Sequence, residues 1–143
     1  MPNTQAIGVA FADPEFQSVD VTGAVTANSV SAGTVTASGA LVLKSATVAA
    51  TGSTQTNAAA VTAGFTLVSA ADGTKGVVLP AASAGLVVII KNGANAILKI
   101  YPASGDAVNA LSANASYNIA ANTSTLLVAY DSTTWYSVPL LAS

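Results

Sequence analysis

The sequence predicts an all-β protein, with an extended N-terminal arm and a short β stem followed by a small antiparallel β-sandwich or jelly-roll-like domain. Composition is the first reason, since Ala, Val, Ser and Thr dominate the 143 residues and aromatics make up only 6%. Such a mixture favours many short strands over long helices. The second reason is that Gly, Pro, Asn and Asp recur between short apolar runs, as turn residues do. No segment shows the 3.6-residue apolar spacing of an amphipathic helix.

The arm is predicted at residues 1–20. Three of the six acidic residues and two of the three Phe lie there, and Pro14 favours an extended conformation at Asp13. A frayed terminus is one interpretation. The other, which the aromatic side chains favour, is an arm whose Phe11 and Phe16 insert into a partner. The segment lacks the basic start and long apolar run of a signal peptide, so we expect synthesis in the cytoplasm.

Residues 21–60 are predicted to form the stem and a linker. Val25, Val30 and Val35 recur every five residues, each followed by Ser or Thr and then Ala. This period fits neither an α-helix nor a flat strand. So short a ladder buries little apolar surface alone, and we expect its valines to face another chain or a symmetry mate. A pentapeptide β-helix is the competing interpretation, but it needs more than these three units.

Residues 61–143 are predicted to form the antiparallel sandwich. The continuously apolar run at 86–90 is typical of a strand buried on both faces. Asn92-Gly93 predicts a hairpin that leads into the run at 97–101. About seven short strands at regular spacing suggest a sandwich or jelly roll. The remaining predicted strands lie at 65–68, 76–79, 117–119, 125–130 and 135–138.

The low content of charged residues limits the classes of partner that the protein can bind. Charged residues make up 7% of the chain and the net charge is −2, without any Arg, against about 25% charged residues in an ordinary domain. We therefore expect no nucleic-acid partner, and no basic amphipathic stretch is present for a membrane surface. The surface is either neutral and rich in Ser, Thr and Asn, or hidden in an oligomer or larger assembly. We favour the second interpretation.

Catalytic side chains are scarce. The chain has no His and no Cys, which are the commonest general base and the most easily activated nucleophile. We therefore predict no enzyme, no cofactor and no metal. A carboxylate pair for glycan cleavage or a calcium site would have to use Asp72, Asp106 or Asp131. All three stand in turn sequences, where Asp bonds the local backbone, and we favour that role.

The aromatic residues near the C-terminus leave two interpretations open. They either fill the core and its edge, which we favour, or form a patch for glycan or partner contact. The candidate patch consists of Tyr117, Tyr130, Trp135 and Tyr136.

Four motifs resemble, in their order, a β module common in virion proteins of tailed bacteriophages. They are Gly-Val-Val-Leu-Pro at 76–80, the apolar run ending in Asn-Gly at 85–93, Pro-Ala-Ser-Gly-Asp at 102–106 and Tyr-Asp-Ser-Thr-Thr-Trp at 130–135. Ser132 stands where the module usually has Gly, so this turn can differ in type. The stem resembles the repeats of phage fibre and head-fibre shafts, and the resemblance covers about residues 19–138.

The resemblance implies a capsid decoration protein or short head fibre on the virion surface. Such a protein would be a homotrimer bound to the phage major capsid protein through residues 1–40, with extended segments adding to sheet edges. Its contacts would be Phe11, Phe16, Val25, Val30 and Val35. The alternative is the receptor- or glycan-binding tip of a fibre, which would use the aromatic patch. The short chain favours decoration, since receptor-binding fibres usually carry a long shaft.

Overall fold

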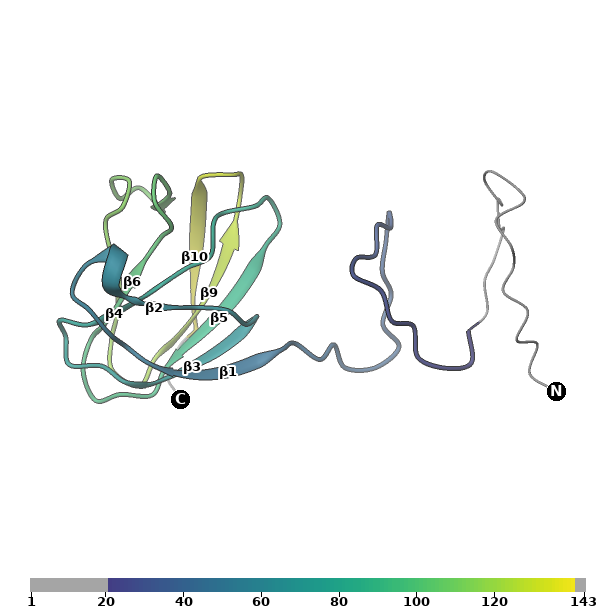
Figure 1. Ribbon diagram of the computed structural model, residues 1–143, viewed down its shortest axis with the longest axis horizontal. Helices are drawn as coiled ribbons and strands as arrows, with labels where there is room; N and C mark the ends of the chain where they lie inside the picture. Colours follow the sequence, from purple (N-terminus) through teal and green to yellow (C-terminus); the bar gives the residue numbers. More distant parts are fainter. Residues whose placement is uncertain (1–20, 141–143) are drawn as a thin grey trace. The chain divides into compact units, whose positions relative to one another are not determined.

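The computed structural model describes residues 21–140, with the side chains described as far as Val138 (Figure 1). The chain divides into two units, one ending at Ser38 and one beginning at Gly39. Residues 21–38 contain bends and irregular backbone but neither helix nor strand. The predictions for Phe11 and Phe16 fall outside the described residues.

The unit that begins at Gly39 is built almost entirely of short strands. One helical segment, the 3₁₀ turn η1, is described in it up to residue 140 and covers Gln55–Asn57. The strands described within residues 39–140 are β1 (Ser45–Ala49), β2 (Ala59–Ala60), β3 (Phe65–Ala70), β4 (Gly76–Val78), β5 (Val87–Asn92), β6 (Leu98–Tyr101), β7 (Ala107–Val108), β8 (Tyr117–Ile119), β9 (Ser124–Ala129) and β10 (Thr134–Leu140).

These strands form two sheets. The large sheet has the order β1-β3-β5-β9-β10-β7, and the small sheet has the order β2-β4-β6-β8. From β1 to β6 the chain alternates between the sheets, and the strands it lays down in each sheet are parallel. This is the winding of a short solenoid, in which each coil gives one strand to each sheet. Figure 1 shows β1, β3 and β5 side by side, followed by β9 and β10.

The last four strands depart from this winding. β8 pairs antiparallel with β6 in the small sheet, and β9 pairs antiparallel with β5 in the large sheet. β10 is antiparallel to β9 and parallel to β7. The core lies between the two sheets, and its largest side chain is the fully buried Trp135 of β10. The other large apolar side chains that are fully buried are Val68, Val77, Ile90, Leu98, Ile100, Val108 and Leu127.

The all-β prediction is confirmed, and the strands do form two sheets. The antiparallel pairing that we expected is found where β8, β9 and β10 are involved. It is wrong for the pairs that β1 to β6 form with one another, all of which are parallel. Each strand in that part is followed by a corner that carries the chain to the opposite sheet. Local turn residues look alike whether the chain turns back in the same sheet or crosses to the other, so the sequence did not separate the two cases.

The predicted hairpin at Asn92-Gly93 is likewise wrong, because β5 and β6 lie in different sheets. A type I′ hairpin turn needs positive φ at both central residues, and neither residue has it. Asn92 is buried instead, and its side chain holds the corner. Its Nδ2 donates to the carbonyl oxygens of Ala96 and Ala120 at 2.8 and 2.9 Å, and its Oδ1 accepts from the N–H of Ala94 at 3.1 Å.

The compact unit begins earlier than the predicted residue 61. β1 pairs in parallel with β3, and β2 pairs with β4, although both strands come from the segment expected to be stem and linker. Ala50 is buried in the core, with Val48 packed against it. Apart from Val48, the strands of this first coil are built of Ala, Thr and Ser, so its sequence lacks the runs of large apolar residues by which the later strands were recognised.

Candidate functional site

The valine ladder is the candidate surface closest to the N-terminus in the described chain. Val25, Val30 and Val35 are 69, 72 and 76% exposed, within a segment that has neither helix nor strand. Burial of a valine side chain is worth about 1.5–3 kcal/mol relative to leaving it exposed. In the single chain, none of the three valines is buried, so this stabilisation is not realised at any of them.

A second apolar segment leads into β1. Leu41, Val42 and Leu43 are all exposed, and Leu43 lies against Gly64, within 3.5 Å of the place where a Cβ on that glycine would stand. β1 is the edge strand of the large sheet. An edge strand presents unpaired backbone donors and acceptors that can pair with another chain.

The third candidate is the side of the large sheet that faces away from the small sheet. We call this the outer face and define it by the residues that alternate with the buried ones along β3, β5, β9 and β10. One row runs across four strands, with Phe65 opposite Ile89, Ile89 opposite Leu126, and Leu126 opposite Val138. A second row, beside the first, consists of Val87, Val128 and Tyr136.

Sequence reasoning missed the outer face. It took the run at 86–90 to be buried on both sides, whereas β5 alternates, with Val88 and Ile90 buried and Val87 exposed. The signal that could have found the face is the apolar alternation shared by β5 and β9. Each strand places aliphatic residues at both its inward and its outward positions.

The predicted aromatic patch is not formed as a set of four. Trp135 is fully buried in the core, and Tyr117 packs against the core from its edge. Tyr130 and Tyr136 remain, 70 and 50% exposed. Their ring centroids lie 5.8 Å apart with an interplanar angle of 70°, which is an edge-to-face pair. The structure therefore reduces the patch to two tyrosines beside the outer face.

Asp72 and Asp131 each bind their own turn, as the sequence predicted. The Asp72 Oδ1 accepts hydrogen bonds from the Thr74 hydroxyl and from the backbone N–H groups of Thr74 and Lys75, and these hold its pKa far below the usual 3.8. The N–H of Thr133, with further bonds from Thr133 and Thr134, lowers the pKa of Asp131 in the same way.

For Asp106 the predicted bonding to the local backbone is wrong. This residue is buried, and its Oδ2 accepts a hydrogen bond at 2.9 Å from the N–H of Ala82, a residue distant in the sequence. The three carboxylates are therefore each committed to backbone groups. Among the described residues, no group of three His, Cys, Asp or Glu side chains lies close enough together to hold a metal ion.

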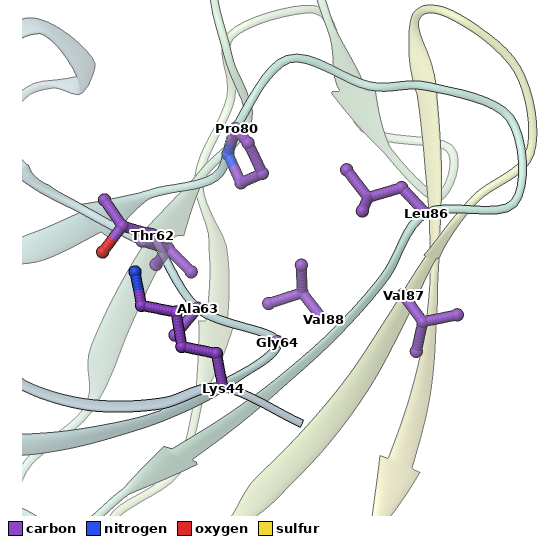
Figure 2. Close-up of a pocket in the computed structure, with 9 residues that line it drawn as sticks. Lys44, Thr62, Ala63, Gly64, Pro80, Leu86, Val87 and Val88 are labelled. Carbon is purple, nitrogen blue, oxygen red and sulfur yellow. The ribbon is translucent and has the colours of Figure 1, made fainter. Parts of the chain in front are cut away.

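A shallow apolar hollow of about 260 Å³ opens where β3 and β5 begin. Figure 2 shows Lys44 and Thr62 on one side of it, and Leu86 and Val88 on the other. Of the described residues that line it, Lys44 alone is charged, and none carries a carboxylate or an imidazole. The hollow can receive an apolar side chain, but it lacks groups for acid–base chemistry.

Comparison of the chain with protein-family models, with curated proteins and with solved structures found no match in any of the three. Within residues 21–140, no helix is long and apolar enough to cross a membrane.

Proposed function

We propose that this protein is a structural virion protein that decorates and stabilises a bacteriophage capsid as a homotrimer. It binds the shell through its N-terminal arm and stem. The observation that carries the proposal is the exposed apolar stem, in which Val25, Val30 and Val35 have no strand partner within residues 21–140 and are more than two-thirds exposed. An extended segment of this kind can add to a sheet edge of another protein, with main-chain hydrogen bonds supplying affinity.

The proposal that the virion is that of a bacteriophage rests on the four sequence motifs that resemble the phage β module. In the fold, the segment 76–80 begins with β4 and the segment 85–93 contains β5. The motif at 102–106 makes the turn between β6 and β7, and the motif at 130–135 makes the turn between β9 and β10. The motifs thus occupy successive strands and corners of one β unit, as expected for a module that recurs as a whole.

The mechanism is mass action. A protein that binds the assembled shell but not its dissociated subunits stabilises the shell, by about 2.7 kcal/mol per site at a free concentration of 100 Kd. The role needs no catalytic group, which agrees with carboxylates that are bound to backbone groups. The decorating role does need a surface whose burial is favourable, and the exposed valines of the stem provide such a surface.

Cosedimentation with undecorated shells of the phage that encodes the chain tests the proposal. The full chain is expected to sediment with the shells and to raise the temperature at which they disassemble. Deletion of residues 2–20, or Asp in place of Val25, Val30 and Val35 together, is expected to abolish both effects. The matched control is Asp in place of the exposed Ile97, which should bind as the unaltered chain does. Unchanged binding by both altered chains would overturn the proposal.

A second candidate function is glycan or receptor binding by a fibre tip, and the exposed pair of Tyr130 and Tyr136 favours it. Aromatic rings present an apolar face to sugars while their hydroxyls remain free to form hydrogen bonds. A glycan array should then give hits that disappear when both tyrosines are replaced by Ala and persist in Leu111→Ala. An array without hits would eliminate this candidate.

A further inference from the structure

We propose that the outer face of the large sheet is the interface between copies of this chain. The inference rests on the proposed function in one respect, since both require an oligomer, and it names the surface that the oligomer uses. Four of its side chains, Phe65, Val87, Tyr136 and Val138, are 37, 41, 50 and 50% exposed, and the remaining apolar members are half-buried.

The composition of the central strands is the first argument. Strands covered on one side alternate apolar and polar residues, whereas strands covered on both sides are near-continuous apolar runs. β5 reads Val-Val-Ile-Ile-Lys-Asn and β9 reads Ser-Thr-Leu-Leu-Val-Ala, so both are of the second kind over most of their length. The small sheet covers only one side. The sequences of β5 and β9 therefore predict a second covering layer, which the described strands of this unit do not provide.

The size of the outer face is the second argument. Its exposed side chains, with Tyr130 at the margin, form a patch in the size class of the largest apolar patch on a typical monomer, roughly 300–600 Å², which is often functional. One side of a standard protein–protein interface covers about 800 Å². The exposed Leu41, Val42 and Leu43, which precede the edge strand β1, add apolar area in the same unit. The face can therefore form the apolar centre of an interface between copies, with the half-buried Ile89, Leu126 and Val128 beneath it.

Charge identifies a second copy as the occupant. Lys91 is the only charged residue among the outward positions described on β3, β5, β9 and β10, and its amine already donates to the carbonyl oxygen of Asn122. A charged partner would therefore find no complement there. A pleated face of Val, Ile, Leu and Phe is complementary to another such face, as in sheets that pack about 10 Å apart. A second copy provides that face. A chain with only 7% charged residues also gains solubility by hiding it.

Introduced charges on the outer face provide the first test. Val87→Glu combined with Val138→Glu is compared with Ile97→Glu combined with Leu111→Glu, which alters two equally exposed residues away from the face. Sedimentation equilibrium of the full chain should give a multiple of 13.9 kDa for the unaltered protein and for the control. The face variant should give the single-chain mass, with a cooperative thermal transition that shows it is folded. A single-chain mass for the unaltered protein at micromolar concentration, or an unchanged mass for the folded face variant, would overturn the inference.

Thiol labelling gives a second measurement that does not depend on breaking the oligomer, in case the charged variant fails to fold. The chain has no cysteine, so one introduced thiol reports its own surroundings. Maleimide should label Val87→Cys at least tenfold more slowly than Ile97→Cys, and the difference should vanish on dilution below the dissociation constant of the oligomer. Equal rates at high concentration would contradict the inference.

The two proposals fail in different ways. An oligomer that dissociates in the face variant, but that never sediments with shells, would refute capsid decoration and leave the interface standing. An unaltered protein that binds shells and has the single-chain mass in solution would refute the interface and leave shell binding standing.

Discussion

The carboxylate of Asp106 accepts a hydrogen bond at 2.9 Å from the backbone N–H of Ala82, inside the buried part of the β unit. Ala82 belongs to the connection between β4 and β5, and Asp106 directly precedes β7. The bond therefore ties a corner of the solenoid winding to the strand that pairs with β10. Asp106 also makes the turn that the sequence predicted, through its own N–H to the carbonyl oxygen of Ala103 at 3.0 Å.

Replacement of Asp106 tests whether this bond stabilises the fold. Asp106→Ala leaves the buried N–H of Ala82 without an acceptor, which should lower the free energy of unfolding by about 1–3 kcal/mol. Asp106→Asn keeps an acceptor oxygen of the same reach and should cost less. Urea unfolding followed by the fluorescence of the buried Trp135 measures both. Equal losses for the two variants would show that the hydrogen bond is not what stabilises this region.

The three aspartates show which side-chain hydrogen bonds a local sequence pattern can predict. Asp72 and Asp131 bond donors two and three residues ahead, so the turn sequence alone predicts them correctly. The partner of Asp106 lies 24 residues away. Its position depends on how the coils stack, and no local pattern encodes that.

Of the candidate surfaces too, one could be predicted from a local sequence pattern and one could not. The exposure of the valine ladder followed from a five-residue period that no single helix or strand can bury. The outer face could not be predicted from the sequence in this way, because recognising it requires knowing which strands are neighbours. The row from Phe65 to Val138 forms only because β3 pairs in parallel with β5, and because β5 with β9 and β9 with β10 pair antiparallel.

Asn92 holds the corner between the sheets, and its amide is predicted to be irreplaceable by a carboxylate. Asn92→Asp keeps the acceptor for the N–H of Ala94 but removes both donors. The carbonyl oxygens of Ala96 and Ala120 then lose part-buried hydrogen bonds, each worth about 0.5–1.5 kcal/mol. Asn95→Asp is the control, since exposed Asn95 acts there as an acceptor from Asn122 Nδ2. A midpoint of thermal unfolding that falls equally in both variants would contradict this role.

Gly76 is predicted to be required for the close approach of β4 and β6. A Cβ on this residue would stand 2.7 Å from the carbonyl oxygen of Lys99 and 2.7 Å from the ring of Tyr101. Gly76→Ala should therefore destabilise the protein by about 1–3 kcal/mol through overpacking. In the matched change Gly64→Ala, the new methyl group meets nothing closer than the Cβ of Leu43 at 3.5 Å. That variant should stay within about 0.5 kcal/mol of the unaltered protein. A larger loss for Gly64→Ala than for Gly76→Ala would show that this crowding is not the limiting contact.

Asp72 and Asp131 predict how stability changes with pH. Hydrogen bonds from Thr74 and from Thr133, respectively, lower their pKa values in the folded protein below the usual 3.8. Between the folded and unfolded pKa values the unfolded chain binds more protons, so the free energy of unfolding rises with pH in that window. The stabilisation should be complete above about pH 5 and should decline as the pH falls below 4.

Urea unfolding between pH 6 and pH 2 measures this decline. Asp72→Asn combined with Asp131→Asn retains an acceptor oxygen at each turn but removes the titrating groups. The double variant should therefore lose less stability than the unaltered protein over the same interval. The ion pair of Asp72 with Lys75, 3.1 Å apart and half-exposed, is worth little in water, so Lys75→Gln should leave the pH dependence nearly unchanged. Identical pH profiles for the unaltered protein and the double variant would show that the turn hydrogen bonds do not favour the ionised carboxylates.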